Sequence, residues 1–163
     1  MDGVGPEVCG PARSARRFDD PGPHPARGHR TKGRLLSVVG LGSDIASVSR
    51  MQDILARHGE RFLQRCFRPD EVAYILSKRP GQPQAASAAA RWAAKEAFLK
   101  ALGLSVAHIP YRDVEVVRDP AGPVSLRLHG RARESLGTHP GRRCLLSLSH
   151  ERENALAVVL IED

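Results

Sequence analysis

Two carboxylates, Asp44 and Glu96, are the residues whose surroundings most clearly indicate chemistry. Glu96 lies in the segment 87–103, where Ala, Leu, Phe and Trp residues make a helix apolar on every side. Such a helix is buried, and a lone buried carboxylate is costly. Glu96 therefore either pairs with Lys100, one helical turn further on, or acts as a metal ligand or catalytic base together with a second acid.

Asp44 is the candidate for the second acid. It lies at the end of an apolar segment, 35–45, that we expect to be a buried strand, and a strand end can deliver its side chain into a cleft. The alternative is that Asp44 caps the helix that follows. Two carboxylates close to Lys95 and Lys100 would suit Mg²⁺, which takes one or two protein carboxylates and completes its shell with water and phosphate oxygens. The combination of two carboxylates with two lysines therefore favours a diphosphate substrate, which would supply the remaining ligands of the metal.

His150 is a third candidate, because it closes the alternating apolar and polar segment 142–150. We expect it to contact a substrate rather than to act as a general base, and a structural role is the alternative. Ser147 and Ser149 share one face of the same predicted strand and lack a nucleophile elbow, which argues against a serine hydrolase.

Arginines recur at helical spacing through the predicted helix 47–67 and just beyond it, at Arg50, Arg57, Arg61, Arg65 and Arg68. On a continuous helix this spacing places them on one side. The face is either simply solvated or a docking surface for an acidic partner, because Asp53 and Glu60 lie off it. Single-stranded nucleic acid would require interleaved aromatic side chains, and on the predicted strands only Tyr111 is available.

A defined order of helices and strands must position these residues. Helical periodicity predicts helices at 47–67, 70–77, 87–103 and 130–137, with a loop at 79–84. Alternating or β-branched stretches predict two hairpins, formed by 111–119 with 124–130 and by 142–150 with 154–162. This order favours an α+β fold in which the long helix packs on an antiparallel sheet.

Composition limits the class of protein. The 163 residues are 41% hydrophobic and 26% charged, which is enough apolar material for one domain. No stretch approaches the roughly 20 apolar residues of a membrane-spanning helix, and no secretory signal begins the chain, so we expect a soluble, cytoplasmic protein. Three cysteines without a C-x-x-C spacing argue against a disulfide framework or a zinc site.

The net charge is +7, and much of it lies in residues 1–34, which hold five prolines and six glycines without any period. We interpret this segment as a disordered extension, or as sequence upstream of the true translation start, and residues 35–163 as the single domain. The basic charge keeps a second class open, an α+β nucleic-acid-binding module. A nucleic-acid-binding module would not require an acidic residue such as Glu96 in the apolar helix, which argues against this alternative.

Five blocks follow one another along the chain: VVGLGSDIASVSRM, RFLQRCFRPDEVAYI, ARWAAKEAFLKALG, RDVEVVRDPAGPVSLRLHGRARE and LSLSHERENALAVVLIE. Together they resemble the bacterial holo-acyl-carrier-protein synthases, the small 4′-phosphopantetheinyl transferases. The resemblance runs from about Leu36 to the C-terminus. It implies the 4′-phosphopantetheinyl transferase fold, a homotrimer and active sites at subunit interfaces.

The resemblance also implies a reaction. The 4′-phosphopantetheine group of coenzyme A is transferred to a serine of apo acyl carrier protein, with release of adenosine 3′,5′-bisphosphate. The carrier belongs to fatty-acid or polyketide synthesis, and no membrane or nucleic-acid partner is expected. A carrier-binding scaffold without catalysis is the remaining alternative.

Site residues follow from the same resemblance, position by position. Asp44 and Glu96 are expected to bind Mg²⁺. Because a serine hydroxyl is a weak nucleophile, we also expect Glu96, or a metal-bound water that it orients, to act as the base. The basic residues expected near the coenzyme A phosphates are Lys95, Lys100 and His150. From the chemistry of the reaction, Lys100 is expected to stabilise or protonate the leaving phosphate. The acidic carrier protein is expected to dock on the first helix at Arg50, Arg57 and Arg61.

Overall fold

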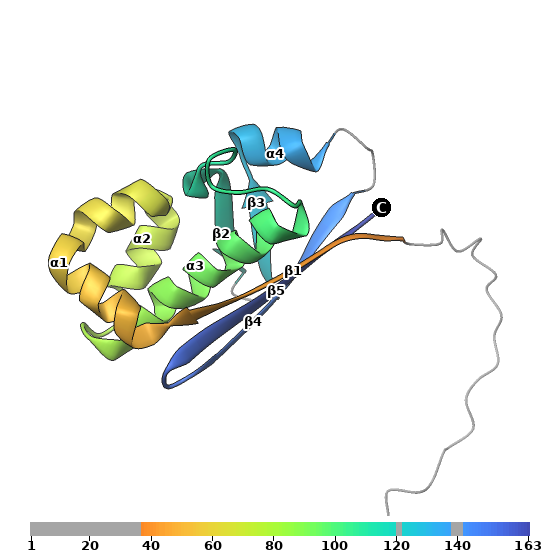
Figure 1. Cartoon of the computed structure of the whole chain (residues 1–163). Helices are drawn as coiled ribbons and strands as arrows, with labels where there is room; N and C mark the ends of the chain where they lie inside the picture. Colours follow the sequence, from red (N-terminus) through yellow and green to blue (C-terminus); the bar gives the residue numbers. More distant parts are fainter. Residues whose placement is uncertain (1–36, 120–121, 138–141) are drawn as a thin grey trace, which may run out of the picture. The chain divides into compact units, whose positions relative to one another are not determined.

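The computed structural model describes residues 37–119, 122–137 and 142–163, and the extension predicted for residues 1–34 lies outside these ranges. The elements in chain order are β1 (Val38–Ser47), α1 (Val48–Cys66), α2 (Pro69–Leu76), α3 (Gln82–Ala101), the 3₁₀ turn η1 (Tyr111–Asp113), β2 (Val114–Arg118), β3 (Val124–Leu128), α4 (Gly130–Leu136), β4 (Arg143–Glu151) and β5 (Asn154–Glu162) (Figure 1). The predicted α+β class is confirmed.

Two antiparallel sheets organise the strands. The larger has the order β1-β5-β4, and β2 pairs with β3 in a separate ribbon, so both predicted hairpins are present. The central strand is β5, whose sequence NALAVVLIE is apolar on both faces, as is typical of a strand with neighbours on either side. In this sheet Asp44 pairs with Ala157, which pairs in turn with Leu148 on β4.

The long helix α3 packs against β1 and β5 (Figure 1). Glycines permit the close approach: a Cβ on Gly42 would lie 2.0 Å from the carbonyl oxygen of Ala97, and one on Gly40 would lie 2.4 Å from that of Ala101. The helix begins at Gln82, five residues before the predicted Ser87 and inside the predicted loop. Pro83 did not prevent this, because proline is tolerated in the first turn of a helix.

The first strand differs from its prediction. It is an edge strand that continues past Asp44 to Ser47, and only one of its faces is covered by α3. On the other face Leu41 and Ile45 are 64% and 66% exposed. The expectation of a buried first strand is therefore wrong, because an apolar run is equally compatible with a strand whose outer face no element of the described residues covers.

Helix α1 is interrupted at Gly59, whose φ of 51° and ψ of −135° are non-helical. A positive φ of this kind is accessible to glycine at little cost, and the helical spacing does not carry across it. None of the helices in the described residues is long and apolar enough to cross a membrane.

Candidate functional site

One cavity of about 480 Å³ is lined by both Asp44 and Glu96. Asp44 lines it from β1 and Glu96 from α3. Arg50 of α1, Trp92 of α3 and Asn154 of β5 also line this cavity. The close packing of α3 on the β1 glycines brings the two acids to the same cavity. The structure thus unites the two carboxylates that the sequence singled out.

The partner of Asp44 is Lys100. The ammonium Nζ donates to Asp44 Oδ1 at 2.8 Å and to the backbone oxygen of Ser43 at 3.0 Å. The predicted alternative in which Lys100 pairs with Glu96 is not observed, because β1 offers a carboxylate and a carbonyl together. The helix-cap alternative for Asp44 is also wrong, since Ser47 occupies that place and accepts from the amide of Arg50 at 3.2 Å.

The partner of Glu96 is Tyr111, which the sequence analysis did not assign to the site. The Tyr111 hydroxyl donates to Glu96 Oε1, and the ring of Tyr111 lies 4.4 Å from that of Trp92, centroid to centroid. Burial, followed by the hydrogen bond with Glu96, raises the pKa of Tyr111 above its ordinary value. The hydroxyl therefore keeps its proton at neutral pH and acts as a donor.

These residues fit a divalent cation of the Mg²⁺ type. The described residues contain no cluster of three or more His, Cys, Asp or Glu side chains that could hold a metal by themselves. Asp44 and Glu96 can supply two carboxylates facing one open cavity, and Mg²⁺ is commonly held by one or two carboxylates together with water and substrate phosphates. The donor set is therefore suited to a metal that arrives with a phosphate ligand.

His150 lies in a different cavity, of about 410 Å³. On β4 it pairs with Ala155 of β5, which pairs with Ala46 of β1, so His150 and Asp44 belong to opposite edge strands of the sheet. The α3 residues at this second cavity, among them Arg91, are not those at the first. A single chain therefore does not bring His150 to the two acids.

The cavity around His150 is cationic. Its lining includes Lys78, Arg91 and Arg118 and no acidic side chain among the described residues. Lys78 and Arg91 both lie over the ring of Tyr74, at 4.0 and 4.1 Å from its centroid. Arg91 is 6% exposed, donates to Ser87, and its Nε has no hydrogen-bond partner in the part of the chain that the structure describes. A buried guanidinium with a spare donor suits an anion. The sequence analysis did not single out Arg91, because hydropathy along one helix does not show which polar groups surround a given side chain.

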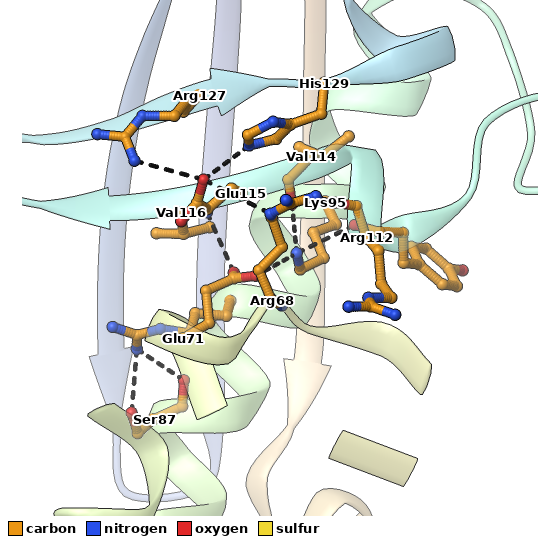
Figure 2. Close-up of polar contacts among 12 residues, drawn as sticks. Arg68, Glu71, Ser87, Lys95, Arg112, Val114, Glu115, Val116, Arg127 and His129 are labelled. Atoms are coloured by element: carbon orange, nitrogen blue, oxygen red, sulfur yellow. Dashed lines mark hydrogen bonds and ion pairs between the residues drawn. The ribbon is translucent and has the colours of Figure 1, made fainter. Parts of the chain in front are cut away.

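Lys95 does not reach either cavity. Its side chain has no exposed surface, and Nζ donates to Glu71 Oε2 at 2.8 Å, to the backbone oxygen of Tyr111 at 3.1 Å and to that of Val114 (Figure 2). All three ammonium protons are therefore used inside the protein. This contradicts the prediction that Lys95 contacts the coenzyme A phosphates, because a strong acceptor on α2 draws the ammonium group inward.

Glu71 completes this buried ion pair. It accepts from the amide of Arg68 at 2.9 Å and from the amide of Val116 at 3.1 Å. In Figure 2 the neighbouring Glu115 is linked to His129, the residue between β3 and α4, at 2.7 Å. Arg127 approaches the same carboxylate at 3.6 Å. This network ties α2, α3 and the β2–β3 ribbon together and is structural.

The arginines do not form one stripe. Gly59 separates Arg50 and Arg57 from Arg61 and Arg65, and all four are exposed. Arg68 turns toward the β2 side instead and donates to the backbone oxygen of Arg112 at 3.4 Å. Only Arg50 lines the cavity of the two acids. The predicted single face is therefore divided at Gly59. Arg50 and Arg57 lie before the kink, and Arg61 and Arg65 lie beyond it.

Comparisons with known proteins show the family to which the sequence is similar. The sequence model of the 4′-phosphopantetheinyl transferase superfamily matches residues 40–157. The holo-[acyl-carrier-protein] synthase of Treponema denticola is 45% identical over 125 residues, which cover 77% of this chain and 98% of the relative. That of Halorhodospira halophila is 46% identical over 125 residues, covering 76% and 97%.

Solved structures of the same family are similar in fold. A holo-(acyl-carrier-protein) synthase from Bacillus anthracis, solved in complex with CoA (3′,5′-ADP), superposes with a TM-score of 0.64 at 28% identity and covers 77% of this chain and 97% of its own.

Proposed function

The chain belongs to the 4′-phosphopantetheinyl transferase superfamily, and we propose that it transfers the 4′-phosphopantetheine group of coenzyme A to a serine of an apo acyl carrier protein in a Mg²⁺-dependent reaction that releases adenosine 3′,5′-bisphosphate. The observation that carries the proposal is the presence of Asp44 and Glu96 on one cavity, approached from different elements. An acyl carrier protein of fatty-acid or polyketide synthesis fits this chemistry. The substrates of the proposed reaction favour a cytoplasmic location for the enzyme.

Asp44 and Glu96 would hold the metal. When bound there, Mg²⁺ supplies a fixed positive charge for the oxygens of the diphosphate on which negative charge grows. The bond between the serine oxygen and the β-phosphorus forms as the bond from that phosphorus to the bridging oxygen breaks. We assign Glu96 to accept the serine proton, since a serine hydroxyl is a weak nucleophile without a base.

The exposure and position of Lys100 support a role in stabilising the leaving group. Its side chain is 52% exposed and is attached to Asp44 at the cavity, so it can turn to a phosphate oxygen without breaking a buried contact. An exposed ion pair of this kind contributes little to stability. We therefore assign Lys100 to stabilise the phosphate of adenosine 3′,5′-bisphosphate as it departs.

The carrier protein would dock beside the same cavity. Arg50 lines it, and Arg57 and Arg61 present further exposed positive charge on α1. Acyl carrier proteins are acidic, so complementary charge would guide the serine to the cavity and fix its orientation.

We further propose that the enzyme is a homotrimer with active sites between subunits. Rows of apolar side chains cross the outer face of the main sheet, for example Leu41 beside Leu160 and Leu160 beside Leu145. Such a face favours burial against a second copy. Association would also bring the cationic cavity of His150 and Arg91 in one copy toward the acids of the next, where it would bind the phosphates of coenzyme A.

Mass spectrometry tests the proposed reaction directly. The protein is incubated with coenzyme A, Mg²⁺ and an apo acyl carrier protein, and the carrier is expected to gain the mass of one phosphopantetheine group. A carrier whose acceptor serine is replaced by alanine should gain nothing. Transfer that continues unchanged in the presence of a chelator would contradict the metal-dependent part of the proposal.

A further inference from the structure

Tyr111 is held at three points by one side of α3. Its ring contacts Trp92, its backbone oxygen accepts from Lys95 and its hydroxyl donates to Glu96. The three α3 residues are spaced by three and one, so they lie on the same face of the helix over a single turn. Tyr111 itself begins η1, ten residues beyond the end of α3 at Ala101.

The backbone of Tyr111 is held in place by the buried Lys95. Lys95 is fully buried and fixed by its ion pair with Glu71, and it also donates to the backbone oxygen of Val114. The peptide that carries Tyr111 is therefore tied to α2 and α3 together. A hydroxyl on such a support can impose an orientation on a side chain that would otherwise rotate.

Glu96 is the side chain that needs this orientation. A glutamate has three rotatable side-chain bonds, and Glu96 reaches the margin of the cavity, where solvent competes for its oxygens. The hydroxyl of Tyr111 occupies Oε1 and leaves the second carboxylate oxygen for another partner. Hydrogen bonds of this kind orient metal-binding carboxylates and affect the affinity for the metal.

We propose that Tyr111 is a positioning residue for Glu96, whose hydroxyl fixes the carboxylate in the orientation that binds the divalent cation. This inference rests on the proposed function, because it requires Glu96 to bind a metal. It assigns to Tyr111 no contact with the reacting atoms and no proton transfer.

Tyr111→Phe tests the role, since it removes the hydroxyl and keeps the ring against Trp92. We expect Mn²⁺, used as the probe cation, to bind about tenfold more weakly in isothermal titration calorimetry. Trp92 is the only tryptophan of the chain, so any change in its fluorescence on Mn²⁺ addition should shift to correspondingly higher concentration. The apparent KM for Mg²⁺ should rise by a similar factor, with kcat at saturating Mg²⁺ largely retained.

Ser77→Ala is the matched control, because it removes another hydroxyl hydrogen bond, from Ser77 Oγ to the backbone oxygen of Tyr74 at 2.7 Å. It should leave Mn²⁺ affinity unchanged. Equal Mn²⁺ affinity in Tyr111→Phe and the wild type would overturn the inference, even if thermal stability fell. So would a higher KM for the carrier protein at unchanged metal affinity, which would place Tyr111 in carrier recognition.

Two outcomes separate this inference from the proposed function. If the wild type binds Mn²⁺ and the variant binds it more weakly, but no phosphopantetheine is transferred in the mass assay, the positioning role holds and the proposed reaction is wrong. If the wild type binds no divalent cation, with or without coenzyme A, both are overturned.

Discussion

Lys100 donates to Asp44 on β1, at 2.8 Å between Nζ and Oδ1, although Glu96 lies only four residues away on the same helix. Lys100 therefore neutralises the acid that comes from the sheet, while Tyr111 satisfies the acid that comes from the helix. Among the residues that the structure describes, the side-chain donor to Asp44 is an ammonium group and the donor to Glu96 is a hydroxyl group. This division explains how two acids share one cavity before a metal binds.

Asp44→Asn and Glu96→Gln should each lower kcat/KM by about a hundredfold, or about 3 kcal/mol of transition-state stabilisation, because each removes a charge that holds the cation. Both amides keep the side-chain volume, so melting temperatures should change little. Turnover and thermal unfolding are measured for both variants with Mg²⁺ and with a chelator. Near-normal turnover by Glu96→Gln together with a marked loss of stability would show that Glu96 is structural.

Lys95→Met should destabilise the fold by about 3 to 5 kcal/mol, because it leaves Glu71 charged and buried without its cation. Arg127→Ala is the control: it removes an ion pair whose arginine side chain is 58% exposed, and it should cost less than about 1 kcal/mol. Urea unfolding measures both. A Lys95→Met protein of normal stability with a raised KM for coenzyme A would restore the phosphate-contact role that the burial of Lys95 contradicts.

Charge reversal of Arg50 and Arg57 together to Glu should raise the KM for the carrier protein about tenfold or more, since two like charges would then face an acidic partner. The wild-type advantage should diminish with added salt. Arg65→Glu, beyond the kink at Gly59, is the matched control and should have a smaller effect. If the KM for coenzyme A rises instead while that for the carrier stays constant, these arginines bind phosphate.

Subunit mixing tests the interfacial site. Asp44→Asn and His150→Ala should each be poorly active alone, and a mixture allowed to exchange subunits should regain activity, because some interfaces then combine an intact acid pair with an intact His150. A mixture of two Asp44→Asn preparations is the control. Without recovery in a mixture that has demonstrably exchanged subunits, the two cavities do not cooperate across an interface.

Disruption of the apolar sheet face tests the assembly itself. Leu41→Lys with Ile45→Lys should reduce the mass measured by analytical ultracentrifugation and lower transfer activity, because charges would be buried against a second copy. Leu76→Lys, on another exposed apolar residue in α2, should change neither. An unchanged mass for the double variant would exclude this face as the interface.

The sequence by itself determined the elements and the pair of acids. Period and hydropathy are local properties, so the helices, both hairpins and the apolar helix that carries Glu96 could be predicted from spacing alone. The ordered blocks identified the family, which the comparisons confirm, and this removed the nucleic-acid-binding alternative that net charge had kept open.

Only the tertiary structure decided which partner each charged group takes. Lys95 and Lys100 occur on one helix in similar sequence surroundings, yet Lys95 is enclosed by Glu71 and two carbonyl groups while Lys100 remains exposed at β1. Pattern analysis could not distinguish them, because the difference arises from segments far apart in the chain. The same holds for β1, whose outer face has no covering element within the described residues, since burial depends on what packs against a strand and not on its own composition.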